Sequence, residues 1–235
     1  MQFHHYFQVC EFAGGEVGPL SANHPLRHAV QVAGSLHQPT VLLTEVQRPA
    51  GHARPVDVLW WGPGLTSGNG MFIVDLRTPP QVLTMVKISS GALTQELSMT
   101  TAHELGHVMD HLLKVHLIGS GHVTAVGDLY ASEARRPELE AWWAAVQASQ
   151  LYKVLHRTQG FHVHFGSITP GLSDDSPAEC FACSFAQLVA TDSGDATFRQ
   201  ELGIRQNVRS PRYWPDEAFV PIGAALRNVF NQLGW

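Results

Sequence analysis

Apolar residues follow a helical period in some segments of the chain and a strand-like pattern in others. Apolar residues that recur every three or four positions predict helices at residues 24–37, 94–116, 139–157, 176–190 and 216–233. Alternating or continuous apolar runs bounded by glycine and proline predict strands at residues 41–46, 56–61, 71–76 and 82–88. Because the strands precede most of the helices, the pattern predicts an α+β fold with a small N-terminal sheet and a helical C-terminal lobe.

Length and composition indicate a single domain. The chain has 235 residues, of which 44% are hydrophobic, which is enough for one core. We expect a β-containing lobe over about residues 1–118 and a helical lobe over about residues 119–235 of this domain. The net charge of −5 gives no electrostatic basis for binding nucleic acid or an anionic membrane. No apolar run is long enough for a membrane span.

The N-terminal residues and the cysteines bear on the compartment. No basic stretch followed by an apolar run opens the chain, so no secretion signal is predicted. The 3 cysteines are an odd number and do not form the pattern of a disulfide framework. A cytoplasmic location is the default expectation, and a phage-encoded or non-classically exported protein also fits. We expect Cys180 and Cys183 to be small core residues.

The predicted helix at residues 94–116 has an apolar face and a second face with ionisable side chains. The apolar face contains Leu97, Leu105, Val108 and Leu112. On the other face, His103 and His107 are one turn apart in a His-Glu-Leu-Gly-His sequence, so both imidazoles can bind one Zn²⁺. Glu104 is then placed to take a proton from a metal-bound water. The alternative is a core helix with two structural histidines.

Two further residues of this helix carry predictions. Gly106 lowers helix stability by up to about 1 kcal/mol relative to alanine, so we expect a packing reason, such as a close backbone approach beneath the metal. Asp110 lies on the histidine face. We predict that it is an outer partner of the metal site or a packing residue rather than a ligand, because metal-binding histidines usually donate their second ring N–H to a carboxylate or carbonyl.

A catalytic zinc site needs a third protein ligand, because the fourth position is kept for water. The Gly-x-x-His extension that would supply a third histidine soon after His107 is absent. Glu179 begins a predicted apolar helix, although Ser176 and Pro177 before it also fit a capping box, which needs no metal. His162 and His164 are the main alternative, because both would point to one side of a strand. The downstream candidates are Glu133, Glu140, His162, His164 and Glu179.

The two predicted metal helices together resemble a known family. Residues 103–110 read His-Glu-Leu-Gly-His-Val-Met-Asp, and the helix at residue 179 opens Glu-x-Phe-Ala-x-x-Phe. This combination resembles the zincin metallopeptidases that include the catalytic domain of anthrax lethal factor and the Pro-Pro endopeptidases. The resemblance covers about residues 94–230, including the apolar pattern at residues 218–222, with specific motifs only in the two helices. It implies a zincin-like fold, a Zn²⁺ cofactor, His103, His107 and Glu179 as its ligands, and Glu104 as the general base.

The chain departs from this family in two places. His107 and Glu179 are 72 positions apart, longer than we expect for the family, which predicts an insertion over residues 119–136. Family members place an oxyanion-stabilising tyrosine seven residues before the ligand glutamate, and here that position is Leu172. Tyr152 and His164 are the first candidates to replace this tyrosine, and Tyr130 and His162 are further ones.

The prediction for function is a zinc-dependent endopeptidase. We expect its substrate, an extended peptide or protein segment, to pair with an edge strand at residues 82–88. The alternative is a zincin-fold assembly or interaction module, from a phage particle or toxin system, with weak or no proteolysis.

The low charged fraction and the paired tryptophans predict a protein partner. Only 15% of residues are charged, and Trp60–Trp61 and Trp142–Trp143 are adjacent pairs. We expect an exposed apolar patch and self-association or a stable partner, with Trp60–Trp61 as the contact. At least one of Trp142 and Trp143 should point into the helical lobe, because adjacent helical residues point about 100° apart. The alternative is that all tryptophans belong to the core.

Overall fold

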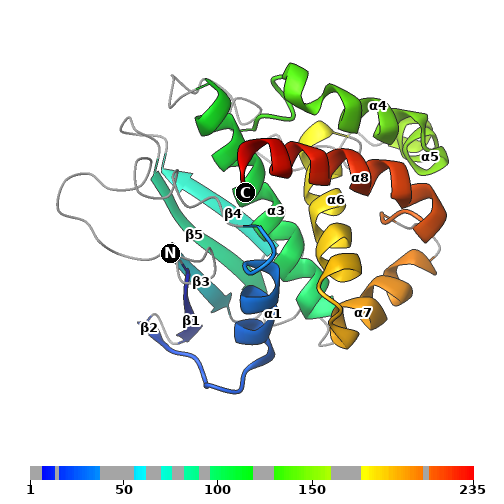
Figure 1. Ribbon diagram of the computed structural model, residues 1–235. Coiled ribbons are helices and arrows are strands. Elements are labelled where there is room, and N and C mark those ends of the chain that lie inside the picture. The colour runs from blue at the N-terminus through cyan, green and yellow to red at the C-terminus, as the bar shows by residue number, and fades with distance from the viewer. Residues whose placement is uncertain are drawn as a thin grey trace.

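The structure, a computed structural model, describes residues 7–13, 16–37, 56–61, 70–75, 82–89, 96–118, 130–159, 176–208 and 212–235. It shows a mixed α+β fold that is mostly helical, with a sheet at one side of the molecule (Figure 1). The sheet consists of β1 (Phe7–Ala13), β2 (Glu16–Pro19), β3 (Val56–Trp61), β4 (Gly70–Asp75) and β5 (Val82–Ser89).

The strand order of the sheet is β2-β1-β3-β5-β4. β1 pairs with β3 and β3 pairs with β5 in parallel, whereas β2 and β4 are antiparallel to their neighbours. β5 therefore has β3 on one side and β4 on the other, and β4 is at the edge of the described sheet. The prediction that residues 82–88 form an edge strand for the substrate is wrong, because their backbone groups already pair with two neighbouring strands.

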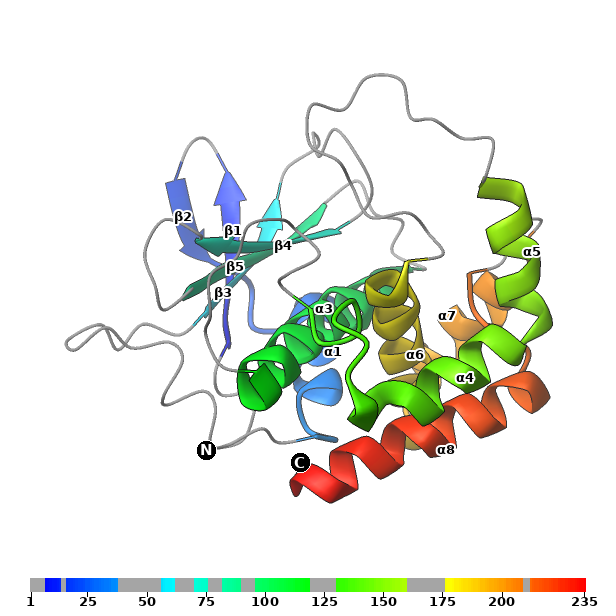
Figure 2. The ribbon, with the colours of Figure 1, turned by 90° about the horizontal axis from the view of Figure 1, so that it is seen from above.

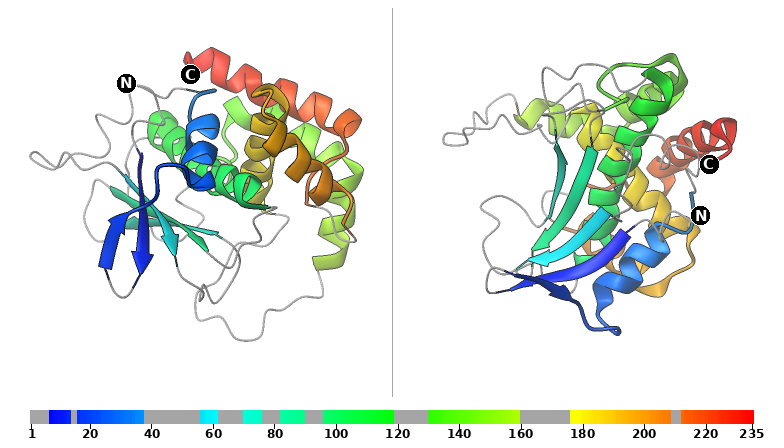
Figure 3. Two further views of the ribbon diagram at one scale, coloured as in Figure 1. Left: turned by 90° about the horizontal axis from the view of Figure 1, so that it is seen from below. Right: turned by 90° about the vertical axis from the view of Figure 1, so that its left-hand side faces the viewer.

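Helix α3 (Leu97–Ile118) lies at the centre of the molecule, between the sheet and the helical lobe (Figures 1 and 2). α1 (Pro25–Ala33) packs beside α3 on the same side of the sheet (Figure 3). α6 (Pro177–Asp192) also packs against α3. The helical lobe is completed by the 3₁₀ turn η4 (Pro137–Leu139), α4 (Glu140–Ala148), α5 (Gln150–Gln159), α7 (Ala196–Gln206) and α8 (Asp216–Leu233).

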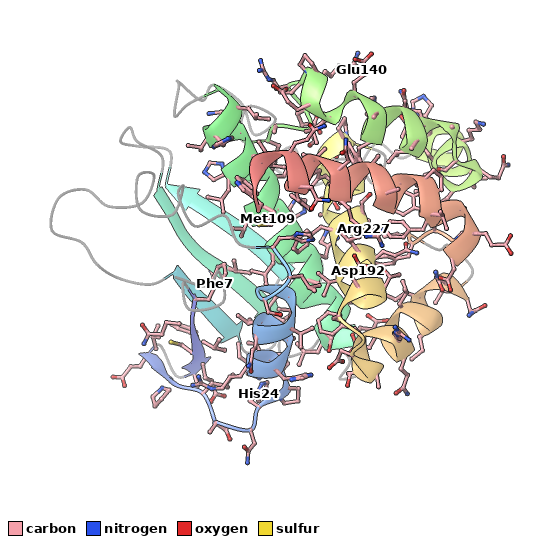
Figure 4. The ribbon with its side chains drawn as sticks, in the orientation of Figure 1. Phe7, His24, Met109, Glu140, Asp192 and Arg227 are labelled. Atoms are coloured by element: carbon pink, nitrogen blue, oxygen red, sulfur yellow. The ribbon has the colours of Figure 1, made fainter. Side chains whose placement is uncertain are left out.

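The core is continuous from the sheet through α3 to α6 and α8. The predicted apolar face of α3 is buried throughout, with side chains Leu97, Leu105, Val108 and Leu112. On the far side of α6, the ring of Phe230 from α8 meets Phe181 and Phe185 edge to face at centroid distances of 6.5 and 6.2 Å. At the C-terminal end of α6, Asp192 lies next to Arg227 of α8 and accepts two hydrogen bonds of 2.6 and 2.7 Å (Figure 4).

Most of the predicted elements have the expected type. The terminal helix has the predicted bounds, and the helices at residues 94–116 and 176–190 differ only at their ends. The predicted helix at residues 139–157 is two helices, because Ser149 has an extended backbone (ψ 146°) that separates α4 from α5. Residues 41–46, and most of the predicted insertion at residues 119–136, lie outside the described residues.

β1, β2 and α7 were not predicted from the sequence pattern. In β1 the buried Phe7 and Val9 flank the exposed Gln8, so an alternating signal was present at the start of the chain. α7 buries only Phe198 and Leu202 among its apolar residues, which is too few to produce a helical period.

The described tryptophan side chains are either buried in the core or partly buried against it. Trp142 is fully buried, which confirms that one ring of the Trp142–Trp143 pair points into the lobe. Trp60 and Trp143 are half-buried against the core, and the side chain of Trp61 lies outside the described residues. Among the residues that the structure describes, the exposed large apolar side chains are Val17, Val154, Ile204, Val208 and Val220, which do not include a tryptophan. Self-association through Trp60–Trp61 stays a prediction. None of the described helices combines the length and apolar character needed to cross a membrane.

Candidate metal centre

The two histidines of α3 face the first turn of α6. Their rings lie one helical turn apart, with centroids separated by 4.9 Å and planes nearly perpendicular. The Nε2 atom of His103 is 3.3 Å from Oε2 of Glu179, and the Nε2 atom of His107 is 3.4 Å from Oε1 of the same carboxylate. The fold therefore brings together, as predicted, two neighbouring imidazoles and a carboxylate that lies 72 positions beyond the second of them in sequence.

These three side chains form a group that could hold a metal ion. One ligand atom from each of His103, His107 and Glu179 can be chosen so that all lie within 4.8 Å of one another. Among the residues that the structure describes, no other set of histidine, cysteine or acidic side chains has this arrangement. Burial alone would raise the pKa of Glu179, but the two histidines hold that pKa well below its usual value, which favours the anionic form that a metal needs.

The position of Glu179 depends on how α6 begins. Ser176 is the N-cap, and its Oγ accepts a hydrogen bond of 3.2 Å from the backbone N–H of Glu179. Pro177 occupies the first helical position, where its missing N–H costs nothing. The capping prediction and the ligand prediction are therefore compatible, because the backbone of Glu179 takes part in the cap while its carboxylate points to the histidines.

α3 and α6 approach each other closely at Gly106. A Cβ atom at this position would lie 2.7 Å from Cα and 3.0 Å from the carbonyl oxygen of Ala182 on α6. Only glycine allows this approach, and the contact lies next to His107 in sequence. The predicted packing reason for Gly106 is confirmed, and the backbone that approaches it belongs to α6.

Glu104 is buried beside the metal group and beneath the edge strand. Its side chain is only 6% exposed. Burial raises the pKa of Glu104, although the positive field of the two histidines opposes this effect. Gly70, the first residue of β4, lies against it, since a Cβ there would be 2.5 Å from both Cγ and Oε1 of Glu104. This contact has no local signal in the amino-acid pattern, because the strand and the helix are far apart along the chain.

Asp110 fits the second of its two predicted roles, that of a packing residue. Its carboxylate accepts hydrogen bonds from the backbone N–H (2.9 Å) and from the hydroxyl of Ser132, and burial raises its pKa to about 7 despite these bonds. Its backbone carbonyl accepts a further bond from Ala131. Nδ1 of His107 is buried and has no hydrogen-bond partner among the described residues. Asp110 therefore holds the turn that contains Ala131 and Ser132 against α3.

The same turn contacts both metal helices. Tyr130 is buried, and its ring centroid is 5.5 Å from that of His107. Oε1 of Glu133 accepts a hydrogen bond of 3.2 Å from the backbone N–H of Ala178, so this carboxylate caps α6 next to Glu179. Segment 130–133 thus connects the middle of α3 to the ligand turn of α6.

The remaining candidate residues lie elsewhere. Tyr152 is on α5, where its ring packs against Trp143 and His156 at 5.3 and 5.6 Å. Glu140 is exposed at the outer end of α4 (Figure 4). His162, His164 and Leu172 lie outside the described residues.

Comparisons with known proteins return no match for this chain, whether against family models, curated proteins or solved structures. The assignment of the site therefore depends on its own geometry and chemistry.

Proposed function

We propose that the protein is a zinc-dependent endopeptidase with a zincin-like fold. The observation that supports this most strongly is the spacing between Glu179 and the two histidines. Zinc bonds of about 2.0–2.1 Å in tetrahedral geometry place neighbouring ligand atoms about 3.3–3.4 Å apart. The carboxylate of Glu179 approaches the imidazole nitrogens at distances close to this length, 3.3 Å from Oε2 to His103 and 3.4 Å from Oε1 to His107, and one ligand atom from each of the three residues lies within 4.8 Å of the others. Two histidines and one glutamate are also a common ligand set of catalytic zinc.

The chemistry follows from the side chains around the ligands. A zinc ion bound here would supply a Lewis acid that polarises the scissile carbonyl and lowers the pKa of the attacking water. Glu104 accepts the proton of that water and delivers it to the leaving amine. A buried carboxyl with a raised pKa suits this role, because it is a stronger base than an exposed carboxylate and takes the proton from water more readily. Tyr130 is the described tyrosine that packs on a ligand histidine, so we assign it to the oxyanion in preference to Tyr152.

The substrate pairs with β4. β4 is at the edge of the described sheet, and its first residue, Gly70, lies against Glu104. An extended peptide that adds to this edge forms main-chain hydrogen bonds and passes close to the proposed base. β4 thus takes the substrate-pairing role that was first expected for residues 82–88, because those residues have neighbouring strands on both sides.

The test combines metal content with peptide cleavage. The parent should contain about one zinc per chain, and Glu104→Gln should keep this zinc while losing cleavage of a mixed peptide library, because it removes the base and no ligand. His103→Ala should lose both. His116→Ala is the matched control, since His116 is an exposed histidine of the same helix.

Two results would contradict the proposal. If His103→Ala had the same zinc content as the parent, the assignment of the metal site would be refuted. Zinc binding without any cleavage by the parent would favour the alternative of a zincin-fold interaction module.

A further inference from the structure

The two ring nitrogens of His103 both face α6. Nε2 faces Glu179, whereas Nδ1 lies 3.6 Å from Sγ of Cys183, within the range of a hydrogen bond to sulfur. Glu179 and Cys183 are four positions apart on α6, so they lie on one face of that helix. A single face of α6 therefore contacts both sides of one imidazole.

The contact between Cys183 and His103 is largely shielded from solvent. The Cys183 side chain is 6% exposed, and the His103 side chain is 15% exposed. The three cysteines of the chain all lie in the described residues, and none is in a disulfide. His107 differs, because its Nδ1 atom has no hydrogen-bond partner in the described part of the chain and its ring packs against Tyr130. Of the two histidines, His103 is the one whose outer nitrogen has a side-chain partner.

We propose that Cys183 is a positioning residue of the metal centre, whose sulfur accepts a hydrogen bond from Nδ1–H of His103. A neutral imidazole carries its proton on one nitrogen, so this bond leaves the lone pair on Nε2, the atom that faces Glu179. It also fixes the rotation of the ring. This inference rests on the proposed zinc site and adds a residue that the ligand motif does not contain.

The experiment compares three variants of the full chain. Cys183→Ala removes the acceptor, and Cys183→Ser keeps a shorter one. Cys180→Ala is the matched control, because Cys180 is a buried cysteine of the same helix whose side chain points about 100° from that of Glu179. Zinc affinity is measured by competition with a chromophoric chelator, and ligand geometry by the visible spectrum of the Co²⁺-loaded protein. Unfolding in excess chelator reports the stability of each variant without metal.

We expect Cys183→Ala to bind zinc about 10–100-fold more weakly than the parent and to shift the Co²⁺ bands, as is typical for loss of an outer partner. Cys180→Ala should keep the parent's affinity within about twofold and its spectrum, because a purely structural loss changes stability and not the ligands. Cys183→Ser should lie between the parent and Cys183→Ala.

Equal zinc affinity of Cys183→Ala and Cys180→Ala would overturn the inference, and so would equal affinity of the serine and alanine variants at position 183. Either result leaves the proposed function intact, because the parent still binds zinc. A parent that binds no zinc would instead refute the proposed function itself, together with this inference.

Discussion

Helices α3 and α6 are both buried along most of their length, yet they bury different kinds of side chain. The buried polar residues of α3 run through the whole helix and are Ser98, Thr100, Thr101, Glu104, His107, Asp110, His111 and Lys114. In α6 the buried residues are small or apolar except for Ser184 and Gln187. Ser184 donates to the carbonyl of Cys180, and Gln187 bonds the backbone N–H and carbonyl of Trp214. The polar groups of α6 thus stabilise packing, whereas α3 supplies most of the reactive groups.

In the proposed metal site the two helices have unequal parts. α3 would provide two ligands and the base, and α6 would provide one ligand and a surface of small residues that lets the helices meet. Substitutions in each helix can separate these two parts.

The first turn of α6 carries the proposed third ligand, Glu179. Glu179→Ala should weaken zinc binding by more than the roughly 10–100-fold typical of an outer partner, because it removes a ligand. Ser176→Ala is the control, since it removes the cap of the same turn. It should lower the free energy of unfolding by about 1 kcal/mol and retain the metal.

Zinc titration and urea unfolding of both variants separate the two effects. If Glu179→Ala retained zinc while His162→Ala or His164→Ala lost it, the third ligand would belong to residues 162–164.

The second prediction concerns the close approach of α6 to α3 at Gly106. Gly106→Ala should lower the free energy of unfolding by about 1–3 kcal/mol, because its Cβ would lie 2.7 Å from a backbone atom of Ala182. Gly203→Ala is the same substitution in α7, where no atom lies within 4 Å of the new Cβ. It should stabilise the protein by about 0.5–1 kcal/mol, owing to better helix propensity. Equal effects in urea unfolding would mean that the crossing is looser than described.

A third test uses a histidine that faces the apolar side of α6. The ring of His37 packs against Phe230 and Phe185 at 4.2 and 6.2 Å, and burial lowers its pKa to about 4, although nearby Asp192 opposes this effect. The folded state therefore binds fewer protons than the unfolded state, so this residue's contribution to stability falls as the pH drops from 6.5 towards 4. The expected loss is about 1–2 kcal/mol after allowance for partial exposure.

His37→Phe removes the titrating group and keeps an aromatic ring. The difference in unfolding free energy between pH 7.5 and pH 4.5 should therefore be smaller in this variant than in the parent. An unchanged difference would show that His37 is protonated at no cost beside α6, contrary to the apolar character assigned to that helix.

The sequence allowed both metal helices to be predicted because their signals are local. The spacing of His103 and His107 and the apolar pattern after Glu179 lie within a few turns of chain. The interactions between distant segments could not be predicted in this way. Strand order decides that β4 rather than β5 is the edge, and it depends on how the chain folds back between residues 70 and 89. The contact of Gly70 with Glu104 and that of Cys183 with His103 depend on the angle at which elements cross.

The close contact at Gly106 and Ala182 also decides how far a disturbance at one end of α6 moves the ligands. If α6 tilts about this contact, each residue moves in proportion to its distance from the pivot. Glu179 is three residues from Ala182, or about 4.5 Å along the axis, whereas Asp192 is ten residues away, or about 15 Å. A tilt that displaces Asp192 by about 1 Å would move Glu179 by only about 0.3 Å. The proposed metal ligands therefore lie close to the pivot, and a displacement at the far end of α6 changes their spacing by only about a third as much.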